Sequence, residues 1–419
     1  MRSRRPARST AFWSIAVLLV LVLAASGVPS PLYRVYQERF GFSSGVLTTV
    51  FAVYAFALLT ALLVVGALSD HVGRRPVLIA GLLLEAAAMV LFLFAGDVGW
   101  LMAARVVQGL ATGAMTGALG AALLDFQRPD RPLGPLVNSA SPGFGLSLGA
   151  VAAGLLVEFV PAPTDWVFGV LAGGFVLAAL AVALRLPESS PRLPGAVASL
   201  RPQVHVPAAQ RPAFFIVLPC LAATWAIGGL YASLGPSLVA GVFGVDDHLV
   251  GSLIVLALNG TGLVGSLATR ALAPERGMIV GALIFAAGVG GTVIALAAGS
   301  LALFFAAAVV SGFGFGSAFL GAMATVTRGV VPGERAGLLS SVFVVSYLMF
   351  SLPAIAAGLA VGVVGLTRTA EIYGVAVIVL ALSAAAALHL RRRAAKHLRR
   401  RAADEPAAQD AEPTDALAA

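Results

Sequence analysis

The chain has 419 residues, of which 59% are hydrophobic and 11% are charged, whereas soluble domains hold about 45–50% and 25%. This composition excludes a soluble domain and indicates a membrane protein. The net charge of +8 does not indicate a nucleic-acid binder, because the arginines are spread over short loops and both termini. The single cysteine, Cys220, excludes a disulfide framework, and the five histidines lack metal-ligand spacing, so we expect no metal or other cofactor.

Twelve apolar stretches follow one another along the chain, and each is long enough to cross a ~30 Å hydrocarbon core as a helix. The first also resembles a signal peptide, but it is long for one, and we interpret it as a span. The predicted spans are 11–33, 45–67, 77–96, 99–124, 133–158, 164–184, 213–240, 248–270, 277–297, 300–327, 336–364 and 369–390.

The basic residues support an even number of spans. Of the 27 Lys and Arg residues, 23 fall in the termini and in the loops after even-numbered spans. Because positive charge accumulates on the cytoplasmic side, this bias predicts that both termini lie in the cytoplasm. We therefore expect a multi-pass protein of the cell (inner, cytoplasmic) membrane, in contact with the lipid bilayer.

Composition also divides the chain into regions. Residues 186–212 are polar and rich in proline, which predicts a cytoplasmic linker between an N-terminal bundle, 11–185, and a C-terminal bundle, 213–390. Residues 1–10 form a basic cytoplasmic start. The tail 391–419 is first basic, which indicates a membrane-surface anchor, and is then expected to be disordered from Ala402 onward.

The loop after the second span is the most specific feature. It reads Gly-Ala-Leu-Ser-Asp-His-Val-Gly-Arg-Arg-Pro-Val over 66–77. This loop resembles the signature loop between helices 2 and 3 of the major facilitator superfamily, and its anchors are all present. They are Gly66, Leu68, Ser69, Asp70, Gly73, Arg74 and Arg75.

The resemblance implies a major facilitator fold, which is an all-α membrane protein with twelve transmembrane helices in two parallel six-helix bundles and a substrate site between them. In that family the matching acid docks on the start of helix 11, and the matching arginine pairs with an acid at the end of helix 4. Here those partners are the Gly333–Gly337 region and Asp125. We expect Asp70, Arg74 and Asp125 to form a latch that favours the outward-facing state. The alternative is a loop that only marks topology.

Two charged residues inside spans are candidates for proton coupling. Arg105, with Gln108, Gly109 and Gly113, resembles the family motif of helix 4, whose arginine is tied to proton coupling. The family usually pairs it with an acid in helix 1, but 11–33 holds no carboxylate. Glu85 is the carboxylate deepest in a span, and it is either a proton site or a hydrogen-bonded structural residue.

The fifth span carries small residues at helical spacing. Gly145, Gly149 and Gly154 resemble the antiporter motif of helix 5, although Ala150 and Ala153 replace a proline and a glycine of that pattern. Small residues let helices approach closely, and we expect this groove to receive the eighth span. The pattern favours drug/proton antiport over generic packing.

Family position gives a set of candidate residues for the substrate cavity. Most are aromatic or weakly polar, which suits a hydrophobic or mildly cationic solute. They are Ser30, Tyr33, Gln108, Asn138, Trp225, Tyr231, Asn259, Phe313 and Phe315.

The leading interpretation is thus a proton-coupled exporter of small hydrophobic or cationic compounds, expected to act as a monomer. A proton symporter or uniporter that imports a small metabolite is an alternative within the same fold. A non-transporting membrane receptor is the alternative of another class. We expect no enzyme, because the sequence has no catalytic constellation and no nucleotide-binding loop.

Overall fold

The computed structural model describes residues 4–131 and 133–404, and within them the chain is helical with no strand among its elements. Twelve segments are long and apolar enough to span a membrane. Their helices are α1 (Arg4–Gly27) with α2 (Pro29–Phe40), α3 (Ser44–Val65), α5 (Arg74–Leu93), α6 (Val98–Phe126), α7 (Gly134–Phe159), α8 (Pro163–Arg185), α10 (Arg211–Phe243), α11 (His248–Thr269), α12 (Pro274–Ala298), α13 (Leu301–Val326), α14 (Pro332–Val364) and α15 (Leu366–Asp404). The protein is therefore an all-α, multi-pass membrane protein.

Several helices extend beyond the predicted spans. The first span runs from Arg8 to Phe40 and bends where α1 meets α2, next to Pro29, because proline cannot donate a backbone hydrogen bond. It ends at Gly41, whose φ of +66° gives a left-handed C-cap. The predicted span ended at Tyr33 because the residues that follow are polar, but the helix continues through them. Hydropathy indicates which residues cross the membrane and does not indicate where a helix ends.

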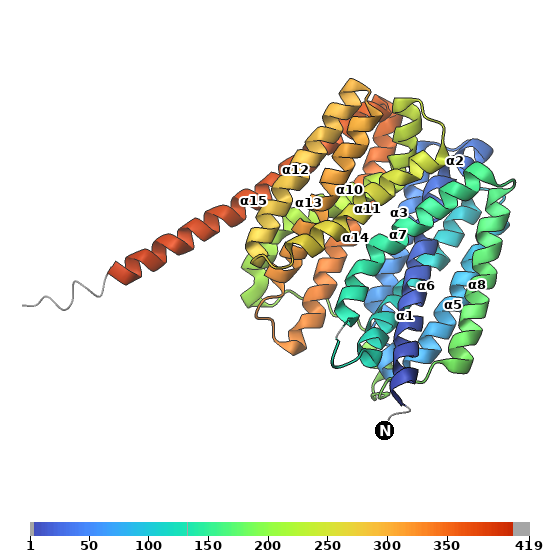
Figure 1. Cartoon of the computed structure of the whole chain (residues 1–419), viewed down its shortest axis with the longest axis horizontal. Coiled ribbons are helices and arrows are strands. Elements are labelled where there is room, and N and C mark those ends of the chain that lie inside the picture. The colour runs from blue at the N-terminus through green and yellow to red at the C-terminus, as the bar shows by residue number, and fades with distance from the viewer. Residues whose placement is uncertain (1–3, 132, 405–419) are drawn as a thin grey trace, which may run out of the picture.

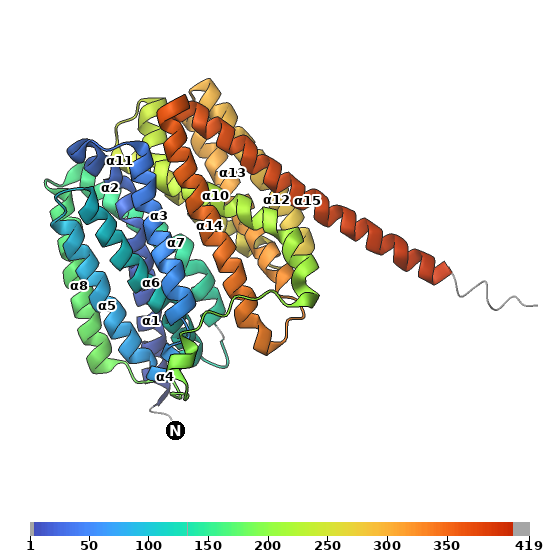
Figure 2. The ribbon, with the colours of Figure 1, turned by 180° about the vertical axis from the view of Figure 1, so that it is seen from behind.

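The spans form two six-helix groups, one before and one after the linker (Figure 1). The groups meet chiefly through two helix pairs, α3 with α14 and α7 with α11. We call the end that carries the short helix α4 (Ser69–Val72) and the linker the linker end, and the opposite end the far end. Figures 1 and 2 show the ribbons of the two groups close together at the far end and diverging toward the linker end.

Side-chain contacts agree with this closure at the far end. Arg34 of α2 forms an ion pair with Asp246 at 2.8 Å, and Glu158 of α7 accepts a hydrogen bond from the backbone N–H of His248 at 3.2 Å. The hydroxyl of Ser30 donates to the carbonyl of Ala232 at 2.6 Å. Each bond joins the first six spans to the last six, and together they describe a conformation closed at the far end.

The linker crosses the linker end in an extended path with two short helices, α9 (Ala196–Ser199) and η1 (Ala208–Gln210). At the other terminus α15 continues past the predicted span and projects from the bundle (Figure 2). The helix therefore includes 402–404, where we expected disorder, so that expectation was wrong for these residues. The remaining tail residues, 405–419, and residues 1–3 of the basic start lie outside the described residues.

Candidate functional site

The signature loop folds around one glycine. Gly73 separates α4 from α5 and has a φ of +113°, a conformation that residues with a Cβ rarely adopt. A Cβ at this position would also lie 2.5 Å from an oxygen of Glu188. A tight turn and a close approach thus both require glycine here. Gly66 caps α3, and its backbone packs against Gly117 of α6.

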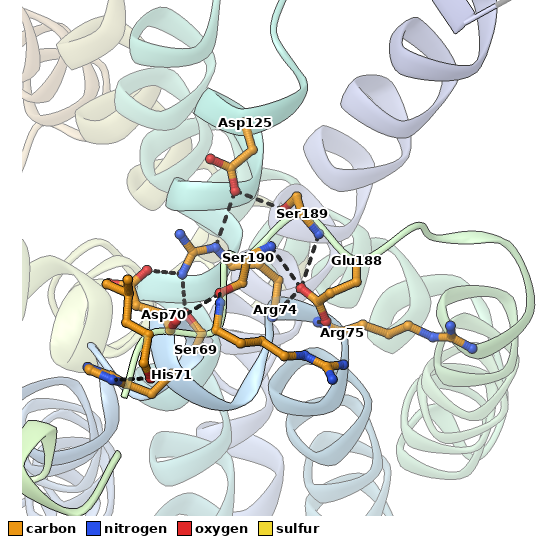
Figure 3. A network of polar contacts seen from close by, with 11 residues as sticks. Ser69, Asp70, His71, Arg74, Arg75, Asp125, Glu188, Ser189 and Ser190 are labelled. Atoms are coloured by element: carbon orange, nitrogen blue, oxygen red, sulfur yellow. Dashed lines mark hydrogen bonds and ion pairs between the residues drawn. The ribbon is translucent and has the colours of Figure 1, made fainter. Parts of the chain in front are cut away.

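Arg74 is the centre of the loop's polar network (Figure 3). Its guanidinium forms ion pairs with Asp70 and, at 3.3 Å, with Asp125 at the end of α6. It also donates to the hydroxyl of Ser69 at 2.8 Å. Arg74 is buried, so a partner is required for its charge. The structure therefore brings three predicted latch residues together within the first six spans.

Glu188, which follows Leu186 and Pro187 at the start of the linker, caps the N-terminus of α5. Its carboxylate accepts hydrogen bonds from the backbone N–H groups of Arg74 at 2.8 Å and Arg75 at 3.2 Å, and from those of Ser189 and Ser190. Partial burial alone would raise the pKa of Glu188, but these backbone donors outweigh it and hold the pKa below its ordinary value. Glu188 is thus a stable anion at the helix N-terminus.

Further bonds attach the linker to the same loop. Ser190 donates from its hydroxyl to the carbonyl of Asp70 at 2.9 Å, and the N–H of Leu193 donates to that carbonyl at 3.0 Å. Ser189 donates to Asp125 at 2.8 Å. Residues 188–193, which we call the linker clasp, therefore fasten the linker to the first six spans.

Asp70 makes no contact with the Gly333–Gly337 region among those described, contrary to the family-based expectation. The linker lies there instead, and the N–H of His205 donates to the carbonyl of Gly337 at 3.2 Å. The physical reason is the conformation, since the two groups of spans diverge at this end. Docking of Asp70 on α14 thus stays a prediction for the opposite state.

A second polar network is buried within the first six spans. Arg105 lies 4.0 Å from the ring centroid of Tyr54 and donates to Gln108 at 2.6 Å. Gln108 donates in turn to the carbonyl of Ala25 in α1 at 3.0 Å, and the hydroxyl of Tyr54 donates to Ser26 at 2.8 Å. Arg105 is 1% exposed and has no carboxylate partner among the described residues. A cation–π contact with Tyr54 and the side-chain amide oxygen of Gln108 replace the missing acid of helix 1.

Glu85 belongs to the same region. It is fully buried on α5, and one carboxylate oxygen accepts a hydrogen bond from the hydroxyl of Thr112 at 2.6 Å. The other oxygen has no partner among the described groups. Thr112 lies seven residues after Arg105, about two helical turns, so both side chains share one face of α6. An unpaired oxygen of a buried carboxylate is costly, and a bound proton would lower that cost by removing the charge.

An aromatic cluster joins the two groups of spans beside this network. Trp225 of α10 lies 5.1 Å from Tyr347 and 5.8 Å from Phe350 of α14, measured between ring centroids. Phe350 in turn lies 5.0 Å from Phe51 of α3 and packs against the small cluster of Tyr54, Ala55 and Leu58. The indole N–H of Trp225 has no partner among the described groups. Tyr54 therefore lies over the buried arginine and belongs to the small cluster against which Phe350 packs.

The other cavity candidates are scattered. The hydroxyl of Tyr231 bonds to Thr292 of α12, which places it inside the last six spans. Asn138 is exposed, and Asn259 donates to the carbonyl of Val255 in its own helix. Tyr231 and Asn259 are thus bonded within the last six spans, whereas the side chain of Asn138 is open to its surroundings.

Three candidates lie nearer the network and the cluster. Phe315 stacks on Phe319, which also contacts Trp225, and Phe313 packs by its backbone against Gly265. Tyr33 is buried within 6.0 Å of Arg105, with its hydroxyl unpaired among the described groups.

The glycines of α7 receive two different helices. A Cβ at Gly145 or Gly149 would overlap α1, at Leu23 and at the carbonyl oxygen of Ala24, whereas one at Gly154 would overlap Ser252 of α11. The expectation that this groove receives the eighth span therefore holds at Gly154, whereas Gly145 and Gly149 receive α1 instead. Nine residues at 100° each turn the helix by about 180° between Gly145 and Gly154, so the two glycines face opposite sides.

Sequence reasoning missed several residues of these networks. Glu188 and the clasp serines follow a span, in a stretch that reads only as a polar linker. Tyr54 and Thr112 lie in apolar spans, where a lone polar group gave the only signal.

Comparison with known proteins agrees with the fold. The family model "Major Facilitator Superfamily" matches residues 15–352. The chain is 38% identical over 125 residues to a class C tetracycline resistance protein of Escherichia coli, covering 29% of this chain and 30% of that protein. It is 30% identical over 188 residues to the 4-hydroxybenzoate transporter PcaK of Pseudomonas aeruginosa, covering 42% and 40%. An uncharacterized transporter of Rickettsia felis is 29% identical over 175 residues, with 40% and 41% covered. The matches thus span less than half the length of each relative.

Solved structures share the architecture. A bacterial homologue of the human lysosomal transporter Spinster, in an inward-facing and occupied conformation, superposes with a TM-score of 0.73 at 16% identity and covers 93% of this chain and 97% of that one. The human organic anion transporter MFSD10 superposes with a TM-score of 0.63 at 15% identity, with 90% and 99% covered. A match to the family model over most of its length, together with this shared architecture, means that the chain belongs to the Major Facilitator Superfamily and is a transporter, not an enzyme.

Proposed function

We propose that this transporter exports small hydrophobic or cationic compounds in exchange for protons. The observation that carries the proposal is Glu85, a fully buried carboxylate that accepts a hydrogen bond from Thr112 through one oxygen and has no partner for the other oxygen among the described groups. Such a group inside a span can bind and release a proton during a transport cycle. The partial similarity to a tetracycline resistance protein supports export.

In the proposed cycle the two groups of spans rock about the midplane. The solute contacts the aromatic cluster around Trp225, where ring faces suit an apolar or cationic compound. Tyr54 lies over Arg105 and belongs to the small cluster against which Tyr347 and Phe350 pack, so we propose that it links solute binding to the buried network around Arg105. We further propose that both termini lie in the cytoplasm of a cell-membrane monomer, which makes the described state inward-facing.

The test uses inverted membrane vesicles whose lumen has been acidified, with a pH-sensitive dye. Lipophilic cations, antibiotics and sugars are added in turn. We expect at least one apolar or cationic compound to release protons from wild-type vesicles, and Asp70→Asn vesicles of equal protein content to show no release. Asp130→Asn, an exposed loop acid on the same side, is the matched control and should behave as wild type. Normal transport by Asp70→Asn would remove the latch from the mechanism.

A second variant addresses the proton. Glu85→Gln keeps the hydrogen bond to Thr112 available but cannot exchange a proton. We expect solute flux by Glu85→Gln to lose its dependence on the pH gradient, while Glu334→Gln, at an exposed position of α14, keeps it. Unchanged pH-driven flux in Glu85→Gln would refute the proton role.

Import of a small metabolite is the second candidate. Arg105 has no carboxylate partner among the described residues and lies beside Tyr54 and Tyr33, an arrangement that suits an aromatic anion. One partial relative is named a 4-hydroxybenzoate transporter. Uptake of radiolabelled aromatic acids into intact cells, with no proton release in the vesicle assay, would favour this function.

A further inference from the structure

Arg75 belongs to the signature motif, yet the latch does not use its side chain. Only its backbone N–H takes part, in the bond to Glu188, and Figure 3 shows the side chain pointing away from Asp70 and Asp125. It lines a surface groove of about 490 Å³ between the start of α5 and the linker. The groove is lined by Arg75, Pro76, Ile79, Ala80, Leu83, Glu188 and Arg192.

A second arginine reaches the same groove from the linker. Arg192 has a φ of +52°, a conformation that costs energy for a residue with a Cβ. Bonds on either side hold it, since its N–H donates to the hydroxyl of Ser190 at 3.2 Å and the N–H of Leu193 donates to Asp70. Neither the Arg75 nor the Arg192 guanidinium has a partner among the described residues. The linker clasp thus presents two free cations at one site.

The rest of the groove is apolar and continues along a membrane span. Ile79, Ala80 and Leu83 follow one another along α5, and Leu83 is 48% exposed. Because α5 is long and apolar enough to span a membrane and begins at Arg74, the arginines lie where hydrocarbon meets water. A guanidinium group can donate two parallel hydrogen bonds to the oxygens of one phosphate. The exposed apolar face of α5 next to the arginines suits an acyl chain.

We propose that this groove binds one anionic phospholipid, with its phosphate between Arg75 and Arg192 and an acyl chain along Ile79 and Leu83. Glu188 also lines the groove, but its carboxylate is engaged by four backbone N–H groups. Two guanidinium charges against one carboxylate leave the site positive. The proposal depends on the membrane location alone and holds for either transport direction.

The experiment uses the purified full-length chain in a mild detergent and counts bound lipids by native mass spectrometry. Phosphatidylglycerol is titrated against phosphatidylcholine of the same acyl composition. The test variant is Arg75→Ala/Arg192→Ala. The control is Arg270→Ala/Arg276→Ala, which removes the same charge from two exposed arginines in the equivalent loop of the last six spans. A thermal melt of each variant verifies folding.

We expect wild type and the control to retain one phosphatidylglycerol that phosphatidylcholine does not replace. Affinity should fall about fivefold for Arg192→Ala alone and about thirtyfold for the double variant. Millimolar inorganic phosphate should not displace the lipid, because it lacks the acyl chain. Equal losses in the test and control variants, equal binding of both lipids by wild type, or displacement by phosphate would each overturn the proposal.

Discussion

At the scale of single residues, the signature loop is completed by a carboxylate outside it, that of Glu188. Glu188 completes the cap of α5 and anchors the linker clasp, and neither role is visible from the motif. A Cβ on Gly73 would lie 2.5 Å from the carboxylate of Glu188, so the glycine of the motif leaves the space that the acid of the linker needs. The family resemblance predicted that Arg74 pairs with Asp125, and these two side chains do form an ion pair at 3.3 Å. The role of this pair in a latch stays a prediction.

The lowered pKa of Glu188 has a consequence for pH dependence. A carboxylate whose folded pKa lies below its unfolded value stabilises the fold above the unfolded pKa, and that contribution is lost as pH falls through the folded pKa. The linker clasp should therefore hold throughout pH 5 to 8 and loosen only in stronger acid. Trypsin cleavage after Arg192, compared at pH 6 and pH 8 after correction for enzyme activity, measures this. A clasp that opened between these values would contradict the assignment.

Removal of the charge should open the clasp at neutral pH. Glu188→Gln keeps one acceptor oxygen but loses the anion that four backbone N–H groups bind. We expect cleavage after Arg192 to become severalfold faster than in wild type. Glu334→Gln serves as the control, and equal rates in the two variants would show that the clasp does not depend on the Glu188 charge.

At the scale of elements, hydropathy predicted where the twelve spans lie but not where helices end. The spans were correct because membrane crossing requires apolar length. The extension of α2 to Phe40 and of α15 beyond 390 was not foreseen, because polar residues outside the membrane continue a helix without changing its backbone. The helices that contact the glycines of α7 were not all predicted correctly for another reason. A motif gives the spacing of small residues along a helix, but it does not say which neighbouring helix packs on each face.

This packing predicts different sensitivities for two helical glycines. A Cβ at Gly149 would overlap the backbone of Ala24 in α1, whereas one at Gly173 of α8 would meet nothing within 4 Å. Gly149→Ala should destabilise the protein by about 1–3 kcal/mol, the usual effect of overpacking. Gly173→Ala should change the stability little. Thermal unfolding in detergent, followed by circular dichroism, checks this, and equal melting temperatures would place α1 elsewhere.

At the scale of the whole molecule, the contacts between the two groups of spans differ between the far end and the linker end. The far end is held by a few polar bonds between the groups of spans, of which Arg34–Asp246 is one, while the linker end is bridged by the linker itself. Fold and span number followed from sequence, but the conformation did not, because both states of such a transporter share one sequence and differ by small free energies.

The Arg34–Asp246 pair should therefore bias the equilibrium without dictating it. The side chain of Asp246 is 88% exposed, so the pair is worth less than about 1 kcal/mol. Arg34→Ala should shift the population toward a far-end-open state by at most about fivefold. Spin labels at Gly96→Cys and Gly362→Cys, where added side chains meet open space, report the far-end separation by pulsed electron resonance. Cys220 is buried and should not take up the label.

We expect a single short distance in wild type and an added longer one in Arg34→Ala. Arg39→Ala, five residues further along α2, removes an exposed arginine that stacks on Phe40 and should leave the distances unchanged. If Arg34→Ala retains the short distance alone, the remaining contacts at Ser30 and Glu158 close the far end by themselves. Combining Arg34→Ala with Glu158→Gln then tests that closure, because two independent weak contacts should add in free energy and multiply in population.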